Sequence, residues 1–354
     1  MSDLDAIRDQ ADDQLRRWGA TDEEIERARR SGHLGLLALA SAALPGTLRY
    51  TGDELAAKVG IDRELSRRLW RAMGFPDVED DERVFTDDDV DALATAHGLL
   101  EAGVTDVDVV VQMTRVLGSS MARVAEAVVG AGERRRLGPA GDEELRAELI
   151  VLGAEVGLAT QARLQEYVWR RHLQAAARRR LMAEGRPEGP SVPLAVGFAD
   201  LVGFTALSQQ VDDAELGEVV SRFEDLAFDQ VTARGGRVAK MIGDEVMFVV
   251  EDVTAALEIA VALAEAYADD EVLSDVRVGL AAGDVLAREG DYFGPVVNLA
   301  SRIVNIALPG SVVVPETVHA AMADDDRYSF HAMRTRNLKD IGRVRLWRVR
   351  RRRP

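Results

Sequence analysis

A short segment rich in glycine and proline separates two stretches of this chain that have different hydrophobic patterns. Residues 185–193 read GRPEGPSVP, and both glycine and proline disfavour helix. Apolar residues recur at three- and four-residue spacing before this segment, whereas short apolar runs alternate with helical patterns after it. The sequence therefore predicts a linker at 185–193 between one domain at 1–184 and a second at 194–354.

The first domain is predicted to be all-helical. Ala, Leu, Glu and Arg separate the periodic apolar positions of four segments, at 22–43, 52–75, 86–135 and 142–184. The last segment leads directly into the linker and forms either one long helix or two helices in series.

The second domain alternates predicted strands and helices. A strand at 194–201 precedes a helix at 212–235; strands at 237–241 and 245–250 flank a hairpin, a helix covers 252–269, and a strand pair lies within 274–290. This β-α-β-β-α-β order is that of a ferredoxin-like fold, with a helix at 295–308 and further strands after it. The whole chain is therefore expected to be α+β, and function must be argued from the site.

Composition excludes several classes of function. The chain has no cysteine, which removes disulfides, thiolate zinc sites and thiol catalysis. Its formal net charge of -17 and its pI of about 4.9 oppose binding to nucleic-acid phosphates. No apolar run approaches the ~20 residues of a membrane helix, and the acidic N-terminus does not resemble a secretory signal. We therefore expect a cytoplasmic protein without a membrane span.

Two aspartates form a candidate metal site. Asp200 interrupts an apolar run at the end of the first predicted strand, where its carboxylate needs a positive neighbour to offset desolvation. Asp244 lies in the hairpin that follows Lys240, and this fold places that hairpin beside the end of the first strand. Two carboxylates so placed can hold a pair of divalent cations. Each aspartate taken alone is also typical of an ordinary turn.

The residues after Asp200 are candidates for phosphate binding. Gly203 permits close approach of the backbone, and the amide groups of residues 201–205 can donate to phosphate oxygens where the chain enters the next helix. The candidate phosphate-binding residues are Gly203, Phe204 and Thr205.

A polar pair lies on the predicted helix that begins at Pro295. Asn298 and Arg302 are four residues apart and therefore share one helix face. An amide and a guanidinium suit a substrate with a ring oxygen and a pentavalent phosphorus that carries excess negative charge. The alternative is an exposed polar face without a ligand.

Together these residues have the order and approximate spacing of a known catalytic domain. From about residue 190 to the C-terminus the chain resembles the class III adenylyl cyclase catalytic domain. The resemblance implies roles for three pairs of residues: metal binding by Asp200 and Asp244, adenine selection by Lys240 and Asp291, and transition-state stabilisation by Asn298 and Arg302.

The resemblance also implies a reaction and an assembly. The ribose 3′ hydroxyl of ATP attacks the α-phosphorus, giving cyclic AMP and pyrophosphate, with two divalent cations (Mg²⁺ or Mn²⁺) per site. Adenine offers an acceptor at N1 and a donor at N6, which Lys240 and Asp291 complement, whereas guanine reverses these polarities. The family's site lies across a head-to-tail dimer. Because this chain contains every matched position, a homodimer with two equivalent sites is expected.

A diguanylate cyclase on a related sheet is a further alternative. The hairpin here reads Ile242-Gly243-Asp244-Glu245 and not the Gly-Gly-Asp/Glu-Glu-Phe signature of those enzymes, and the Lys240 and Asp291 pair suits adenine. We therefore rank it last.

Residues 51–70 of the first domain resemble a helix-turn-helix, with the turn at Gly60 and an arginine-rich second helix. Arg83-Val84-Phe85-Thr86 resembles the wing of winged-helix regulators. The alternative function is therefore a nucleotide-sensing, DNA-binding regulator. Many acidic residues surround this segment, and a base-reading surface needs a basic footprint, so we favour a regulatory helical module.

The two-domain arrangement resembles the mycobacterial-type adenylyl cyclases, in which an all-helical N-terminal domain inhibits the catalytic domain and activity rises at acidic pH. The resemblance makes residues 142–184 the expected transmitter. His172 is the candidate proton sensor because it lies among arginines, whose charges disfavour its protonation until the pH falls. The alternative for His172 is a surface histidine. The first domain could also enclose a lipid or another small molecule, although helix packing equally explains its apolar content. The basic residues 348–353 are interpreted as a solvated tail.

Overall fold

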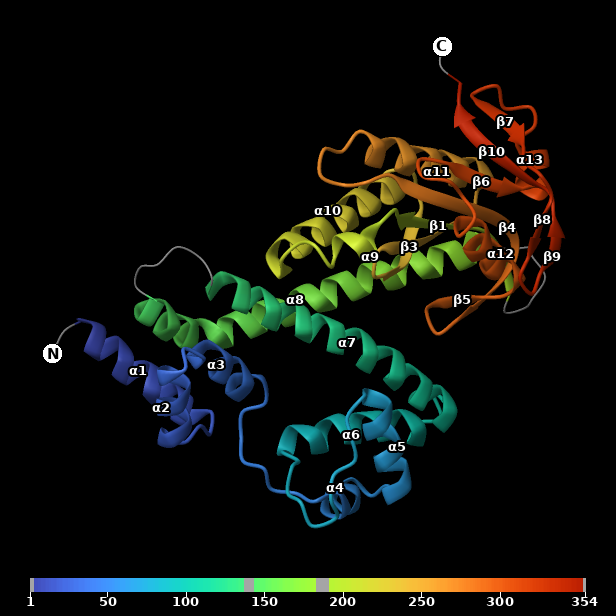
Figure 1. The fold of residues 1–354 in the computed structure, drawn as a ribbon. Coiled ribbons are helices and arrows are strands. Elements are labelled where there is room, and N and C mark those ends of the chain that lie inside the picture. Colours follow the sequence, from blue (N-terminus) through green and yellow to red (C-terminus); the bar gives the residue numbers. More distant parts are fainter. Residues whose placement is uncertain (1–2, 137–142, 183–190, 353–354) are drawn as a thin grey trace. The chain divides into compact units, whose positions relative to one another are not determined.

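The computed structural model describes residues 3–136, 143–182 and 191–352, and it separates into two compact units (Figure 1). Residues Met1–Arg186 make up the first, which we call the helical unit, and Pro187–Pro354 make up the second, which we call the sheet unit. None of the described helices has a stretch long and apolar enough to cross a membrane.

The described part of the helical unit contains only helices and one isolated bridge. The helices are α1 (Asp3–Arg17), α2 (Asp22–Arg30), α3 (Leu34–Ala43), α4 (Gly52–Val59), α5 (Arg63–Met73), α6 (Asp87–Glu101), α7 (Val107–Arg136) and α8 (Glu143–Met182). The all-helical prediction is therefore confirmed, and α8 is one continuous helix. Three of the four predicted helical segments each contain two helices, with Gly32, Gly60 and Gly103 between them, because glycine is a poor helix former. The predicted break at Gly138-Pro139 lies outside the described residues.

Two apolar clusters hold the helical unit together. In the first, α1 and α3 pack against the N-terminal part of α8 through Leu15, Leu34 and Val151, all nearly inaccessible to solvent. The second cluster joins α4, α5, α6 and α7 around Leu69 and Phe85. Only the first part of α8 takes part in these clusters. Most of the exposed apolar side chains of α8 lie further along the helix.

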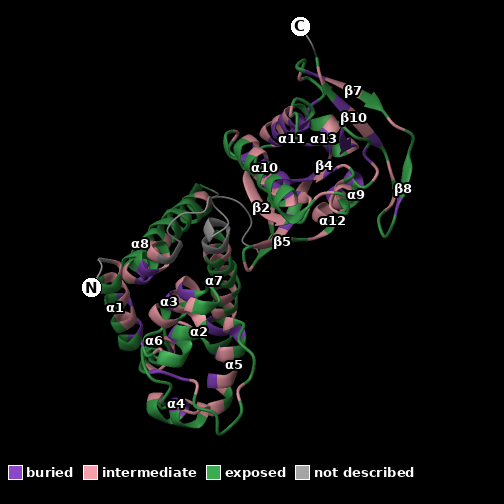
Figure 2. Cartoon of the chain, turned by 60° about the vertical axis from the view of Figure 1, so that its left-hand side comes forward, coloured by how far each residue is buried: buried purple, intermediate pink, exposed green. Residues whose placement is uncertain are grey.

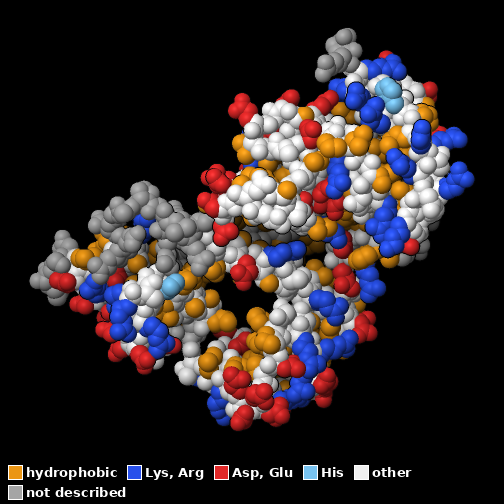
Figure 3. Space-filling model, in the orientation of Figure 1, with side chains coloured by type: hydrophobic (Ala, Val, Ile, Leu, Met, Phe, Trp, Pro, Cys, Tyr) orange, Lys and Arg blue, Asp and Glu red, His pale blue; other side chains and the backbone are white. Residues whose placement is uncertain are grey.

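The helix-turn-helix is present at α4 and α5. Gly60 adopts a left-handed conformation between the two helices, and Tyr50 pairs with Phe85 in the position of the expected wing. Figure 3 shows acidic and basic side chains intermixed over this part of the unit. The ion pairs of α5 are Arg63 with Asp53 and Asp80, Arg67 with Glu64 and Asp80, Arg68 with Asp108, and Arg71 with Asp77. These acids neutralise the positive charge that a DNA-reading helix would present.

The sheet unit has a mixed sheet with helices on both faces. Its elements are β1 (Ser191–Leu201), α9 (Phe204–Leu207), α10 (Asp213–Thr232), β2 (Arg237–Ile242), β3 (Glu245–Val250), α11 (Val253–Ala268), β4 (Val276–Arg288), β5 (Asp291–Phe293), α12 (Pro295–Val304), β6 (Val312–Pro315), α13 (Glu316–Ala321), β7 (Tyr328–Ala332), β8 (Arg336–Leu338), β9 (Gly342–Val344) and β10 (Leu346–Arg351). The strand order is β2-β3-β1-β4-β6-β10-β7, with β5 beside β4 and a separate β8–β9 pair. The predicted β-α-β-β-α-β order is confirmed.

The central strand β1 is buried on both faces because its side chains alternate. Ala195 and Ala199 contact the cluster formed with α10 and α11, whereas Val196 and Phe198 belong to the cluster formed with α12. Figure 2 shows the buried residues concentrated in this sheet and on α11. The end of β1 thus projects from a rigid, fully packed layer.

Two sequence-based expectations for the sheet unit are wrong. The linker was predicted to extend through residue 193, but β1 already begins at Ser191. Pro193 is tolerated there because β3 ends opposite Ala195, so that β1 has a partner on one side only at this point. The strand pair predicted within 274–290 is one long strand, β4, which pairs with the whole length of β1; the glycine at 283 does not form a turn.

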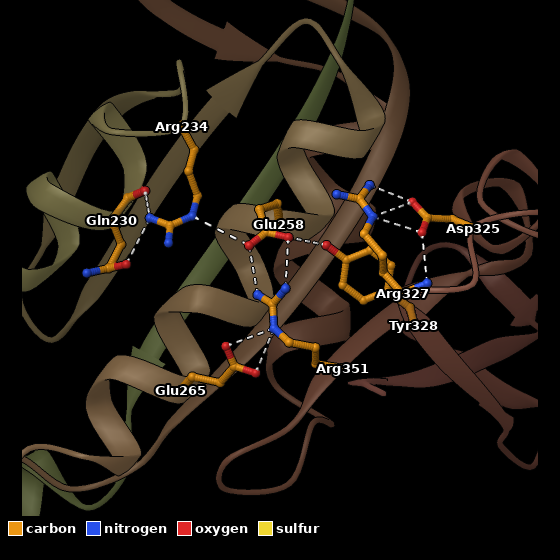
Figure 4. A network of polar contacts seen from close by, with 8 residues as sticks. All are labelled: Gln230, Arg234, Glu258, Glu265, Asp325, Arg327, Tyr328 and Arg351. Carbon is orange, nitrogen blue, oxygen red and sulfur yellow. Dashed lines mark hydrogen bonds and ion pairs between the residues drawn. The ribbon is translucent and has the colours of Figure 1, made fainter. Parts of the chain in front are cut away.

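The predicted solvated tail at 348–353 is also wrong over its described part, because Arg348–Arg351 lies in β10 between β6 and β7. Figure 4 shows the polar network that holds this strand end. Arg351 donates to Glu258 of α11 at 2.7 Å and to Glu265 at 3.1 Å, and Tyr328 of β7 donates to Glu258. The basic residue is therefore an anchor between β10 and α11.

A wholly buried carboxylate lies where α8 meets α1 and α2. Arg29 of α2 donates to Glu148 Oε1 at 3.2 Å and to Asp12 of α1 at 2.5 Å, and Arg8 of α1 lies 3.9 Å from the same oxygen. α3 carries no titratable side chain. Glu148 Oε2 has no hydrogen-bond partner among the described residues. Burial raises the pKa of Glu148 above its ordinary value of 4.5, and the neighbouring arginines offset this only in part.

This arrangement predicts that proton uptake by Glu148 tightens the packing of α8. Because the pKa is raised in the folded chain, its contribution to folding is fully present below about pH 4.5 and is lost as the pH rises through the raised pKa. Each unit of elevation corresponds to about 1.4 kcal/mol lost at high pH. Glu148→Gln should therefore flatten the pH dependence of amide-exchange protection factors in α1 and the start of α8.

The matched control is Glu155→Gln, which changes an exposed carboxylate on the same helix. Its protection factors should follow those of the unmodified chain. Parallel curves for Glu148→Gln and the unmodified chain would contradict the prediction.

Candidate active site

The pairing of three strands brings Asp200 and Asp244 together. Asp200 in β1 lies directly opposite Glu245 in β3, so the neighbouring Asp244 stands in the β2–β3 turn beside the end of β1. The Leu201 amide donates to the Asp244 carbonyl at 2.9 Å and closes this end of the sheet. Burial is the largest cause of the raised pKa of Asp200; Arg277 opposes it, and the charge of the nearby Asp244 raises the pKa further. The sequence-predicted aspartates are thus neighbours.

The positive neighbour that Asp200 needs is Arg277, which the sequence analysis missed. Arg277 lies opposite Asp200 in β4, and its guanidinium is hydrogen-bonded to the Asp200 carboxylate. Asp200 is only 13% exposed, so this ion pair offsets the desolvation of its charge. The only local signal was an arginine inside the apolar run Val276-Arg277-Val278.

Glu245 adds a third acidic group to this end of the sheet. Burial, followed by the charges of Asp200 and Asp244, raises the pKa of Glu245 to about 7. Carboxylates crowded in this way favour protonation or the arrival of a cation.

The residues present fit a divalent cation that is completed by a substrate. The described residues contain no group of three or more His, Cys, Asp or Glu side chains arranged as a metal site. Mg²⁺ usually needs only one or two carboxylates together with waters and substrate phosphates. Asp200 and Asp244 are crowded, and the charge of each raises the pKa of a neighbouring carboxylate. A bound cation would offset this repulsion between negative charges.

The sequence-predicted base-selecting residues are in contact. Lys240 of β2 donates to Asp291 Oδ2 of β5 at 2.6 Å, and both side chains are about one third exposed. The other oxygen of Asp291 accepts the backbone amide of Tyr292 at 2.7 Å. A partly exposed donor next to an acceptor can meet a purine edge that presents the opposite pattern.

Helix α12 presents Asn298 and Arg302 to solvent. Its other face, with Ala300 and Val304, packs closely on β4, where a Cβ atom at Gly279 would lie 2.4 Å from the Val304 nitrogen. Only glycine fits at that position, so it fixes the height of α12 above the sheet. Among the described residues, no hydrogen bond or ion pair joins the side chain of Asn298 or Arg302 to another side chain. The two are on one face, as predicted, but within the described part of the chain no hydrogen bond or ion pair joins them to Asp200 or Asp244.

The predicted phosphate loop is partly committed to the fold. The Leu201 and Val202 amides donate to the carbonyls of Asp244 and Asp275, both at 2.9 Å, so these two are not free for phosphate. Within the described residues, the amides of Gly203, Phe204 and Thr205 have no backbone acceptor. These are the residues that the sequence singled out, and their phosphate role stays a prediction.

Two features of the helical unit bear on regulation. His172 lies in the exposed second half of α8, directly after Arg170 and Arg171, which contact Glu166 and Gln174. Separately, α4, α5, α6 and α7 line a mainly apolar pocket of about 700 Å³ that is partly open to solvent, and its lining residues include Leu69, Trp70 and Met121.

Comparison with known proteins gives the same two parts. The model described as adenylate cyclase regulatory domain matches residues 6–148, and the model described as adenylate and guanylate cyclase catalytic domain matches residues 189–349. An adenylate cyclase of Streptomyces coelicolor is 41% identical over 80% of this chain and 74% of its own length. A protein named pH-sensitive adenylate cyclase from Mycobacterium tuberculosis is 34% identical over 84% of this chain and 77% of its own length.

Among solved structures, the adenylate/guanylate cyclase/hydrolase of Silicibacter pomeroyi is 25% identical, with a TM-score of 0.42 over 46% of this chain and 98% of that one. The assignment rests on the sequence matches, which include both domains in the same order. The chain belongs to the class III adenylate cyclases that carry an N-terminal adenylate cyclase regulatory domain.

Proposed function

We propose that this adenylate cyclase converts ATP to cyclic AMP and pyrophosphate with two divalent cations at a site shared between two copies of the chain. The observation that carries the proposal is the juxtaposition of Asp200 and Asp244 at the end of the central strand. Divalent cations held there would lower the pKa of the ribose 3′ hydroxyl and neutralise the triphosphate. Either Mg²⁺ or Mn²⁺ suits this pair of carboxylates, since both metals accept oxygen ligands.

The remaining side chains position the substrate and stabilise charge. Lys240 donates to N1 of adenine and Asp291 accepts from N6, which favours ATP over GTP. Asn298 orients the ribose, and Arg302 neutralises the charge that builds up on the phosphorane. The amides of Gly203, Phe204 and Thr205 donate to phosphate oxygens. Little covalent chemistry is required of the protein, so placement and charge account for the rate.

A homodimer follows from how these groups are distributed. The metal-binding pair lies at the end of β1, whereas Asn298 and Arg302 lie on the solvent-exposed face of α12 without a side-chain partner among the described residues. A site that needs both sets is completed when the metal-binding pair of one copy faces α12 of another. Because every chain has both sets, a two-fold assembly contains two equivalent sites.

Asp244→Asn should reduce cyclic AMP formation by the full-length enzyme more than about 100-fold, since even the outer partners of metal ligands are worth 10–100-fold. It should also weaken Mn²⁺ binding measured by electron paramagnetic resonance in the presence of a non-hydrolysable ATP analogue. The physical reason is the loss of one of two ligand carboxylates.

The control is Asp284→Asn, which removes an exposed carboxylate from β4 of the same sheet. It should leave both measurements unchanged. Unaltered Mn²⁺ binding in Asp244→Asn would refute the metal role of Asp244.

We further propose that the helical unit controls activity in response to pH and that α8 transmits the signal. Leu164, Tyr167, Trp169 and Leu173 of α8 are each more than half exposed. Apolar side chains in this number on one helix indicate a surface that contacts another element in at least one state of the enzyme. The name of the mycobacterial relative supports pH as the signal.

His172→Ala should shift the acidic limb of the pH-activity curve of the full-length enzyme if His172 is the proton sensor. Protonation adds a positive charge among the arginines of α8, and alanine removes that change. The measurement is cyclic AMP formation from pH 5 to pH 8. His331→Ala, which removes an exposed histidine of β7, is the control. A curve that is unchanged by His172→Ala would exclude His172.

A ligand of the helical unit stays a secondary proposal, supported by the pocket among α4, α5, α6 and α7. Its apolar lining suits a lipid or another small apolar molecule. The DNA-binding alternative has no comparable support, since acids neutralise the arginines of α5.

A further inference from the structure

Two side-chain contacts join β2 to β5. One is the contact between Lys240 and Asp291 described above. In the other, the Arg237 guanidinium of β2 donates to the Tyr292 hydroxyl of β5 at 3.1 Å, and both side chains are partly buried. No proposed catalytic or binding role has so far been given to Arg237 or Tyr292.

An irregularity in β2 places Arg237 and Lys240 on the same side. Residues three apart in a regular strand face opposite sides of the sheet. Here Val238 pairs with Phe248 of β3, and Lys240 pairs with the adjacent Met247. Ala239 therefore has no partner in β3, as in a β-bulge. Lys240 therefore occupies the place of a residue two positions after Arg237. The bulge makes a double contact with β5 possible.

Strand β5 depends on these contacts for its position. It has only three residues, β4 is the one described strand with which its backbone pairs, and the turn before it contains Glu289 and Gly290 at positive φ. Such a short strand at the end of a hairpin is weakly held by its backbone bonds. Because Asp291 Oδ1 accepts the amide of Tyr292, the direction of the Asp291 carboxylate follows the position of the Tyr292 backbone.

We propose that Arg237 and Tyr292 are positioning residues for base selection, which hold β5 so that the Asp291 carboxylate meets the purine edge beside Lys240. The inference rests on the proposed base-selecting role of Lys240 and Asp291. Discrimination by hydrogen bonds depends on placement to within a fraction of an ångström. If β5 were free to shift, the Asp291 carboxylate would accept less well from adenine and oppose guanine less strongly. The preference for ATP over GTP would then fall.

Tyr292→Phe is the most selective test of this contact. The tyrosine ring packs against the apolar cluster that contains Val196 and Phe198, and phenylalanine keeps that packing while it removes the hydroxyl that Arg237 contacts. Arg237→Met removes the donor from the other side and keeps an unbranched side chain of similar length. Since the two changes break the same bond, the double variant should lose little more than either single one.

The measurement is the kinetics of the full-length enzyme with ATP, together with GTP as an alternative substrate or as a competitive inhibitor. In both single variants the preference for ATP over GTP should fall about tenfold, a factor that corresponds to about 1.4 kcal/mol. The change should appear mainly in KM for ATP, with a smaller effect on kcat. Tyr328→Phe is the control, because it removes a tyrosine hydroxyl bonded to Glu258 elsewhere in the unit and should leave the nucleotide preference unchanged.

Asp291→Asn separates the two claims. If it lowers the preference for ATP whereas Tyr292→Phe and Arg237→Met do not, the positioning role is overturned and the base-selecting pair stands. If Asp291→Asn also leaves the preference unchanged, the base-selecting role fails, and the inference about Arg237 and Tyr292 fails with it.

Discussion

The pairing of β1 with both of its neighbours is the constraint on which the rest of the site depends. This register puts Asp200 opposite Glu245 on one side and opposite Arg277 on the other, and it fixes Asp244 in the adjoining turn. A slip by one residue would turn Asp200 toward the opposite face of the sheet. Because both faces of β1 are packed, such a slip would also expose the core, so burial enforces the register that brings Asp200 and Asp244 together.

The second constraint is close packing on β4. Gly279 lets α12 lie so near the sheet that no other side chain fits between them, and the buried face of α12 leaves Asn298 and Arg302 pointing to solvent. The side chains of Asn298 and Arg302, which suit a charged substrate, are therefore held on a well-packed helix. Neither has a side-chain hydrogen bond or ion pair among the described residues. Rigid placement of this kind is the main source of rate in a reaction that needs little covalent participation.

Local patterns predicted much of this arrangement, because the relevant signals are short. Three features are each determined by a few residues that are adjacent in sequence. They are the hairpin at Asp244, the start of α12 at Pro295 and the left-handed turn at Gly60. The sequence predicts a strand pair where β4 is one long strand, because Gly283-Asp284 in its middle is also typical of a turn, whereas pairing with β1 along its length keeps it extended. Arg277 and Glu148 could not be identified, since their partners are distant in sequence and are chosen by packing.

The proposed active site draws residues from two copies of the chain, and subunit complementation tests this most directly. Full-length Asp244→Ala and Arg302→Ala would be co-expressed with different tags, and the mixed dimer isolated through both. One of its two sites would then combine two unaltered halves, so the mixed dimer should recover about half of the normal cyclic AMP formation, whereas each variant alone stays inactive. An inactive mixed dimer would contradict the shared site.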